Sequence, residues 1–430
     1  MTATVAPSVA STAGLPAWME RLLGQLPPAQ GPLAAVQERG RVALAALPVP
    51  SRRQEEWRFT DLSLLTALAA DGLETDLLED PAARPDLPPA AAGAVRLVLD
   101  GRRDPLAGVS LPPGLSALAP TELAQALGHT LAATGCEHHW PVELNHAAAS
   151  QVLALRVASR HSVTLELVSA AGTGLLPLRL LLILEEKAQL EISQSLSAAS
   201  AGLSSLVLEA HLGRGARLHH GLVALASSEA ALLAHLALEQ EPESAASLVV
   251  ASAGWGLARV EPRIRQVDGT ARTTLRGLQL VDGRQIADTH SHVLFSGPEG
   301  ELDQLHKAVA SGCGRSVFNG AVRVPREAQR TNAAQLSRSL LLSDRARIDS
   351  KPELEIVADD VKCAHGATVS SLQTDELFYL QSRGIGSEQA AGLLKRAFCE
   401  EVLRELPPAA RAWCSFDRLL AASGAAEVSG

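Results

Sequence analysis

The stretch EKAQLEISQSLSAASAGLSSLVLEAHLGRGARLHHG (186–221) decides the fold class of this chain. It contains three runs of strand length, AQLEISQSL, SSLVLEAHL and ARLHHG, in which apolar residues dominate or alternate with polar ones. Small and turn-forming residues separate these runs, as turns separate strands. Because similar runs follow one another from about residue 150 to residue 370, this part of the chain is predicted to consist of short β-strands.

An alanine near the start of the strand-like runs recurs at a nearly regular interval. Ala188, Ala216, Ala246 and Ala271 are separated by 28, 30 and 25 residues, and Ala346 lies a further 75 residues on. A period in the twenties with no helical segment inside it favours a β-solenoid, in which each coil stacks on the previous one. A β-sandwich with similar strand spacing is the alternative. The aromatic share of only 3% favours the solenoid, because stacked coils prefer ladders of aliphatic side chains.

Helical patterns flank the strand region. Leu22, Leu23 and Leu26 stand at helical spacing and predict helices within residues 15–75, although Gly40 weakens the pattern in the middle. A Pro/Ala-rich linker (79–94) follows, then the strand-like run VRLVLDGR, and residues 120–135 look helical again. The predicted division is a mainly helical region over 1–140, a parallel β-helix core over 141–370 and a helical domain over 371–430.

The C-terminal pattern predicts a helical hairpin. Gly384 and Gly386 break the pattern after TDELFYLQSR, and Leu394, Phe398 and Val402 then recur every four residues on one helical face. Such a face either docks a partner or packs on the end of the β-helix, and we weigh the two alternatives equally for individual residues.

Composition and charge exclude several function classes. The net charge of −9, from 38 basic and 47 acidic residues, argues against a nucleic-acid or anionic-membrane surface. No apolar run is long enough to span a bilayer, and the N-terminal sequence lacks the pattern of a secretory signal. Five widely spaced cysteines without a CxxC motif suit a reducing compartment, so we expect a cytoplasmic protein.

Motifs of catalysis are sparse. The sequence contains no P-loop, no HExxH and no GxSxG, and we therefore do not expect an enzyme. A β-helix carbohydrate-active enzyme is the alternative, and Asp359 with Asp360 is the tempting acidic pair. Adjacent residues of a strand point to opposite faces, so a regular strand could not aim both carboxylates at one bond.

The motif Cys363-Ala364-His365 is the candidate metal-ligating feature. In an extended strand its thiol and imidazole project to one side, about 7 Å apart at Cα. A thiolate with an imidazole favours iron, zinc or a cluster over magnesium or calcium. Two ligands cannot complete such a site, so a partner chain or exogenous sulfide must supply the others. The histidine pairs, in contrast, are more simply interpreted as solvated polar residues: His138–His139, His219–His220 and His290 with His292.

The segment KPELEIVADDVKCAHGATV (351–369) resembles the signature of the SufD family, which belongs to the SUF iron–sulfur cluster assembly machinery. The resemblance extends upstream over residues 318–349 and downstream through LFYLQSRGI (377–385). EEWRFTDL (55–62) is similar to the N-terminal element of the family. Residues 337 and 365–367 separate the chain from SufB, because Ser337 stands where SufB-type sequences carry a cysteine and His-Gly-Ala replaces their His-Glu-Ala.

The resemblance implies a fold, partners and a site. The fold is a right-handed parallel β-helix with helical domains at both ends. The partners are the paralogue SufB, in a heterodimer, and the ABC-type ATPase SufC, which would explain the missing P-loop; a homodimer of the isolated chain is an alternative. His365 matches the histidine implicated in cluster assembly at the SufB–SufD interface, and Cys363 matches the neighbouring family cysteine. Iron or a cluster is expected only transiently, in complex with SufB, and not tightly bound to the isolated chain.

The C-terminal helices are the predicted ATPase-docking region. The residues expected to contact the partner are Phe378, Arg383, Leu394, Phe398 and Val402. A purely structural scaffold without a metal role is the third hypothesis, which a His365→Ala variant separates from the first.

Overall fold

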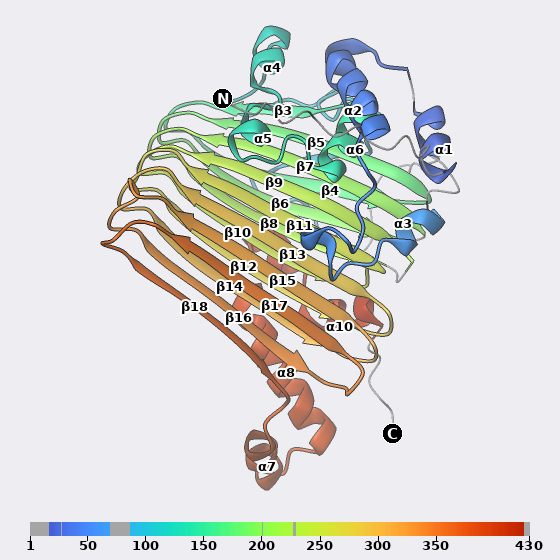
Figure 1. Ribbon diagram of the computed structural model, residues 1–430, viewed down its shortest axis with the longest axis vertical. Helices are drawn as coiled ribbons and strands as arrows, with labels where there is room; N and C mark the ends of the chain where they lie inside the picture. Colours follow the sequence, from blue (N-terminus) through green and yellow to red (C-terminus); the bar gives the residue numbers. More distant parts are fainter. Residues whose placement is uncertain (1–16, 27, 69–86, 200, 227–228, 425–430) are drawn as a thin grey trace, which may run out of the picture.

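The strand region winds into a stack of coils, each of which adds one strand to each of two nine-stranded sheets (Figure 1). The computed structural model describes residues 17–424, apart from 27, 69–86, 200 and 227–228. Sheet A contains β1 (Val95–Val98), β4 (Ser162–Ala171), β6 (Gln189–Ala198), β8 (Arg217–Ala226), β10 (Ala245–Ala253), β12 (Arg272–Val281), β14 (Glu301–Ala310), β16 (Asn332–Leu341) and β18 (Lys362–Ser370). Sheet B contains β2 (Leu115–Ala117), β3 (Leu153–Val157), β5 (Gly174–Leu184), β7 (Gly202–Leu212), β9 (Ala231–Gln240), β11 (Leu257–Gln266), β13 (Ile286–Phe295), β15 (Arg315–Val324) and β17 (Arg347–Ile356).

Neighbouring strands of both sheets run parallel, with one exception: β2 pairs antiparallel with β3. The prediction of a parallel β-helix with helices at both ends is therefore confirmed, and the β-sandwich alternative is wrong. Two antiparallel sheets would be needed for a sandwich. The strands β1 and β2 precede residue 141 and yet pair with β4 and β3, so the N-terminal region contributes to the first coil.

Tight corners before the strands of sheet A explain most of the alanine period. Ala188, Ala216 and Ala271 stand directly before β6, β8 and β12, and each is fully buried. The residue before each alanine has a positive φ: Lys187 (57°), Gly215 (67°) and Thr270 (54°). A small side chain fits the inside of such a corner. Two members of the period are coincidental.

Those two members are Ala246 and Ala346. Ala246 lies within β10, where Ser244 occupies the corresponding corner, and Ala346 precedes β17 of sheet B instead of a strand of sheet A. Neither residue occupies the corner that Ala188, Ala216 and Ala271 share, so their place in the period is a coincidence of spacing.

Side chains inside the β-helix form ladders, because the strands are in register from coil to coil. One ladder of sheet A begins with Val95 and Leu165 and ends with Gln335 and His365. Its members, in order along the stack, are Val95, Leu165, Ile192, His220, Leu248, Leu275, Gln304, Gln335 and His365. Burying a leucine contributes about 1.5–3 kcal/mol, so this ladder is mainly apolar in the early coils, whereas its last three members are polar.

Helices of the N-terminal region cover the outer face of sheet B (Figure 1). They are α1 (Ala17–Gln25), η1 (Gly31–Leu33), α2 (Ala34–Ala46), η2 (Glu55–Trp57), α3 (Ser63–Leu68), α4 (Pro120–Ala126), α5 (His129–Ala133) and α6 (Trp140–Ala148). Leu144 of α6 packs in one apolar cluster with Leu203 and Leu233 of sheet B. Gly40 lies inside α2 because α2 touches α6 there: an added Cβ would approach the Ala147 amide nitrogen to 2.6 Å. Of the predicted linker, residues 79–86 lie outside the described residues, and 87–94 contain no helix or strand.

The C-terminal helices return to the outer face of sheet A. They are α7 (Thr374–Ser382), α8 (Ser387–Leu403), α9 (Pro408–Trp413) and α10 (Phe416–Ser423). Leu403 and Leu419 pack with Val249 and Leu280 of sheet A in one buried cluster. In contrast, α7 projects beyond the last coils (Figure 1) and has no buried residue. None of the described helices combines the length and apolarity needed to cross a bilayer.

Candidate functional site

Cys363 and His365 lie on β18, the last strand of sheet A. They are in register with Ala333 and Gln335 of β16, both of which are buried inside the β-helix. The two side chains therefore share the inward face, as their i, i+2 spacing in a strand requires. The interior is open at this end, since Cys363 is half-buried and His365 is exposed. The structure thus places the predicted pair at the mouth of the β-helix.

The surroundings of Cys363 keep its thiol protonated in the free chain. Cys363 packs against the apolar interior cluster. This burial raises the pKa of the Cys363 thiol, and a backbone hydrogen bond from Ala333 offsets only part of the effect. The thiolate is the form that binds metals, so a metal ion that binds here has to displace the proton of the Cys363 thiol.

A polar track runs inward from His365. Gln335, the ladder neighbour of His365, donates from Nε2 to Oε1 of Gln304 at 2.9 Å. Gln304 in turn donates from Nε2 to the hydroxyl of Ser291 at 2.7 Å. These side chains are buried, so the chain of hydrogen bonds satisfies groups that could not reach water.

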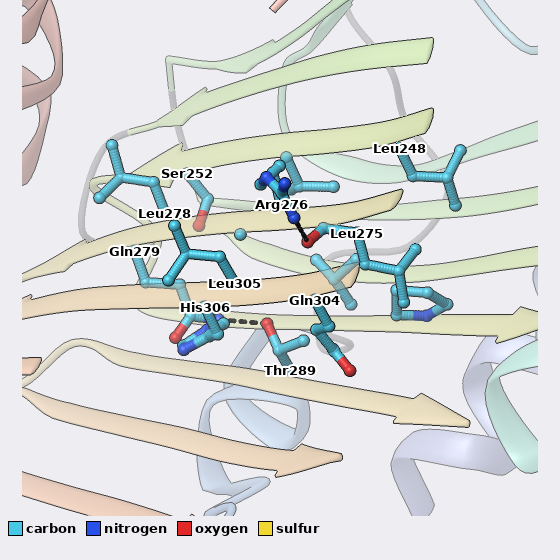
Figure 2. A pocket seen from close by; sticks show the side chains of 14 residues that line it. Leu248, Ser252, Leu275, Arg276, Leu278, Gln279, Thr289, Gln304, Leu305 and His306 are labelled. Atoms are coloured by element: carbon cyan, nitrogen blue, oxygen red, sulfur yellow. Dashed lines mark hydrogen bonds between the residues drawn. The ribbon is translucent and has the colours of Figure 1, made fainter. Parts of the chain in front are cut away.

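The track continues to a narrow interior gap between the sheets (Figure 2). Gln279 donates there from Nε2 to the hydroxyl of Thr289 at 2.7 Å. The ring of His306 stacks on Phe318 with ring centres 4.5 Å apart, and its two nitrogens have no hydrogen-bond partner among the described residues. Burial lowers the pKa of His306 to about 3, so the imidazole is neutral at physiological pH. The last coils thus carry polar groups where the first coils carry leucine.

The strands β17 and β18 are the free edges of their sheets. Neither strand contains a buried residue, although they are ten and nine residues long. Long exposed edges with unpaired backbone groups are normally covered in soluble proteins. Asp359 and Asp360 lie in a bend between the two strands, so the premise that they belong to a strand is wrong.

The five predicted docking residues occupy two different environments. Phe378 is 70% exposed on α7, beside Tyr379, whose ring centre lies 5.3 Å from the Arg383 guanidinium carbon. Val402 is fully buried against sheet A, and Phe398 is partly buried there. Leu394 is half-exposed. The exposed surface of this hairpin is therefore formed by α7 and the first turns of α8.

Comparisons with known proteins agree with this architecture. The family described as "SUF system FeS cluster assembly, SufBD core domain" matches residues 167–398. An iron–sulfur cluster assembly SufBD family protein of Synechocystis is 33% identical over 387 residues, which cover 85% of each chain. The chain belongs to the SufBD family. The chloroplastic protein ABCI7 of Arabidopsis thaliana is 32% identical over 90% of this chain and 86% of its own length, and SufD of Escherichia coli is 45% identical over 103 residues, 24% of each chain.

SufBD membership, with relatives named SufD, confirms the resemblance to the SufD family. It associates the chain with iron–sulfur cluster assembly. It gives the carbohydrate-enzyme alternative no support.

The EEWRFTDL segment shows how this SufBD chain attaches its N-terminal region to the β-helix. Arg259 of β11 lies under the Trp57 ring, with its guanidinium carbon 3.8 Å from the ring centre, and donates to the Glu56 carbonyl at 2.8 Å. The same guanidinium pairs with Asp288 at 2.7 Å and with Glu261 at 2.6 Å. All three ionic side chains are buried. Burial opposes ionisation of Asp288, but Arg259 holds its pKa below the usual range.

The histidine pairs are mostly structural in this SufBD chain. His219 faces outward and contacts the Glu405 carbonyl at 2.9 Å, while His220 faces inward and contacts Gln194 at 2.9 Å. His290 pairs with Asp288 at 3.0 Å. Burial lowers the pKa of the neighbouring His292 to about 4.

One further group was not found by sequence reasoning. Among the described residues, His139, His235 and Glu261 form the one set of three His, Cys, Asp or Glu side chains close enough to hold a metal ion. His139 and His235 are 96 residues apart in sequence, so no local motif joins them. Cys363 and His365 do not belong to this set.

Proposed function

We propose that this chain is a non-catalytic subunit of the SUF machinery whose last coil forms part of a shared cluster-assembly site. A SufB-type paralogue completes the site. The observation that carries the proposal is the position of Cys363 and His365: they are the last members of two interior ladders, on a strand whose outer edge is free. A partner that covers this edge meets both side chains at once.

Ligand chemistry supports a shared and transient site. An iron–sulfur cluster normally takes four protein ligands, and this mouth offers one thiol and one imidazole. The raised pKa of Cys363 weakens binding further in the free chain, because the proton has to leave first. The isolated chain is therefore colourless in this proposal, and iron or a nascent cluster rests at the site only while the paralogue contributes the other ligands.

The edges of β17 and β18 suit a paralogue with the same fold. Exposed backbone groups of an edge strand pair with a strand of the partner, and side chains beside them set the specificity. Exposed apolar side chains on the same coil, Ile356, Val357 and Val369, also match this role, since such side chains are typically covered by a partner.

The projecting hairpin is the proposed docking site for the ABC-type ATPase. Phe378 and Tyr379 are 70% and 57% exposed on α7, and large exposed aromatic side chains are typical of interface anchors. Val402 and Phe398 secure α8 to sheet A, so a force applied at α7 is transmitted to the β-helix. The sequence has no P-loop of its own, which accords with nucleotide hydrolysis by the partner.

Reconstitution of the complex with a His365→Ala variant tests the shared site. We expect the variant to co-purify with the paralogue and the ATPase but to assemble cluster at least about tenfold more slowly. Thr368→Ala is the matched control, because Thr368 is exposed on the same strand and faces outward. Assembly at the wild-type rate by His365→Ala would refute the shared site and leave the family membership untouched.

A further inference from the structure

Three side chains meet where the N-terminal region crosses the outer face of sheet B. One comes from the N-terminal region and two come from strands of the middle coils. His139 is the N-cap residue of α6, and His235 and Glu261 are register partners on β9 and β11. His235 and Glu261 are buried, and the side chain of His139 is 22% exposed. This position is separate from the β18 mouth, so an inference drawn from it does not rest on the shared cluster-assembly site.

The distances between the three donor atoms are nearly equal. Nδ1 of His139 lies 3.4 Å from Nε2 of His235 and 3.5 Å from Oε2 of Glu261, and Nε2 of His235 lies 3.3 Å from the same Oε2. Both nitrogen–oxygen distances exceed the usual 2.7–3.2 Å of nitrogen–oxygen hydrogen bonds. Zinc bonds of about 2.0–2.1 Å at tetrahedral angles place ligand atoms roughly 3.3–3.4 Å apart. The triangle is thus too wide for good hydrogen bonds and has the size of one face of a zinc tetrahedron.

We propose that His139, His235 and Glu261 bind one divalent transition-metal ion, with the tetrahedral geometry of Zn²⁺ and an open fourth position. Two imidazoles and one carboxylate are a ligand set that zinc accepts in proteins, with water or another small ligand in the fourth position. The proposal adds a metal centre to a chain whose family role concerns a different site.

The protonation states of His235 and Glu261 suit metal binding. Burial lowers the pKa of His235 and keeps its imidazole neutral, which is the form that donates to a metal. Burial opposes ionisation of Glu261, but Arg259 and His235 hold its pKa well below the usual range. Hydrogen bonds orient the carboxylate: Oε1 accepts from Arg259 at 2.6 Å, and Oε2 accepts from Arg263 at 3.0 Å. Such outer contacts typically fix a metal-binding carboxylate.

The three side chains lie beside an open hollow. His139 and Glu261 line this surface hollow together with Trp57 and His138. An ion can therefore enter from solvent, and a fourth ligand can exchange. The bound ion also joins α6 to β9 and β11, so it stabilises the attachment of the N-terminal region.

Metal titration of the full chain tests the proposal. After chelator treatment, the wild-type protein is titrated calorimetrically with Zn²⁺ and, without oxygen, with Fe²⁺; Co²⁺ reports the geometry through its visible absorption. We expect about one Zn²⁺ per chain, a tetrahedral Co²⁺ spectrum and a raised melting temperature with Zn²⁺. His139→Ala should weaken Zn²⁺ binding at least about tenfold.

Two controls separate this centre from other metal-binding groups. His211→Ala removes a histidine that lies 3.3 Å from Glu241 without a third ligand, and it should leave the Zn²⁺ affinity unchanged. A Cys363→Ser/His365→Ala double variant should also retain the affinity. If His139→Ala fails to fold, a His139→Cys variant tests the same position. When Co²⁺ is added, we expect a new thiolate-to-Co²⁺ absorption band. Wild-type affinity in His139→Ala, no Zn²⁺ binding by the wild type, an octahedral Co²⁺ spectrum or no new band in a folded His139→Cys would each overturn the proposal and leave an ion-pair cluster only.

Discussion

The two ends of the β-helix are built in opposite ways. At the first coil, Leu97 and Leu115 are buried, and Leu106 and Leu111 of the connecting segment pack against the interior cluster. At the last coil, neither β17 nor β18 has a buried residue, and the ladder that contains Leu165 ends at His365. The first end is closed by the chain itself, whereas the second exposes backbone edges together with polar and apolar side chains. The closed apolar coils and the proposed assembly site therefore lie at opposite ends of one repeating architecture.

Truncation of two residues of the same ladder, one in the closed coils and one at the open end, should give the largest difference in the free energy of unfolding. Leu165→Ala leaves a cavity in the closed coils and should lower the free energy of unfolding by about 2–5 kcal/mol. His365→Ala removes an exposed side chain and should change it by less than about 0.5 kcal/mol. Urea unfolding of the two variants measures both values. A comparable loss in His365→Ala would mean that the last coil is packed as tightly as the first.

The buried histidines should make the free energy of unfolding fall as the pH is lowered. Burial lowers the pKa of His306 to about 3, from 6.5 in an unfolded chain, so only the unfolded state takes up a proton between these values. Stability is therefore full above pH 6.5 and falls as the pH drops, by about 1.4 kcal/mol per pH unit for this residue.

Two leucine variants assign this pH dependence. His306→Leu should flatten the decline in urea midpoint between pH 7 and pH 5, and should add about 1 kcal/mol at pH 7 because the lost nitrogens had no partner. His220→Leu should also flatten the decline, since burial lowers the pKa of His220 to about 4, but it leaves Gln194 without its contact and should not add stability at pH 7. An unchanged slope in His306→Leu would show that the residue is already hydrated.

The C-terminal hairpin should show the smallest effect on stability and a clear effect on binding. Phe378→Ser changes an exposed residue and should alter the free energy of unfolding by less than about 0.5 kcal/mol, while weakening ATPase binding at least about tenfold. Val402→Ala, in the buried part of α8, should instead cost about 2 kcal/mol and leave ATPase binding intact in the folded protein. Equal binding by wild type and Phe378→Ser would place the docking surface elsewhere.

The sequence allowed prediction of the fold because the fold is local and repetitive. A corner residue with positive φ followed by a buried alanine recurs at Ala188, Ala216 and Ala271, and this recurrence is visible in one dimension. The same reasoning wrongly included Ala246 and Ala346 in the period, because sequence spacing does not reveal which sheet a strand joins.

The site could be predicted only in part. Cys363 and His365 are two residues apart on one strand, so their common face follows from strand geometry alone. His139, His235 and Glu261 come from a helix cap and two strands, and only the folded chain brings them together. The spacing of Phe398 and Val402 predicts an apolar helix face, but it does not reveal that sheet A covers that face.

Amide hydrogen exchange of the chain, alone and in complex with the SufB-type paralogue, tests whether the last coil forms the interface with the paralogue. If the last coil is the shared interface, amides of β17 and β18 exchange rapidly in the isolated chain and become protected in the complex, while β4 and β6 are unchanged. Protection confined to the first coils, or no added protection of β18, would contradict the assignment of the open end to the partner.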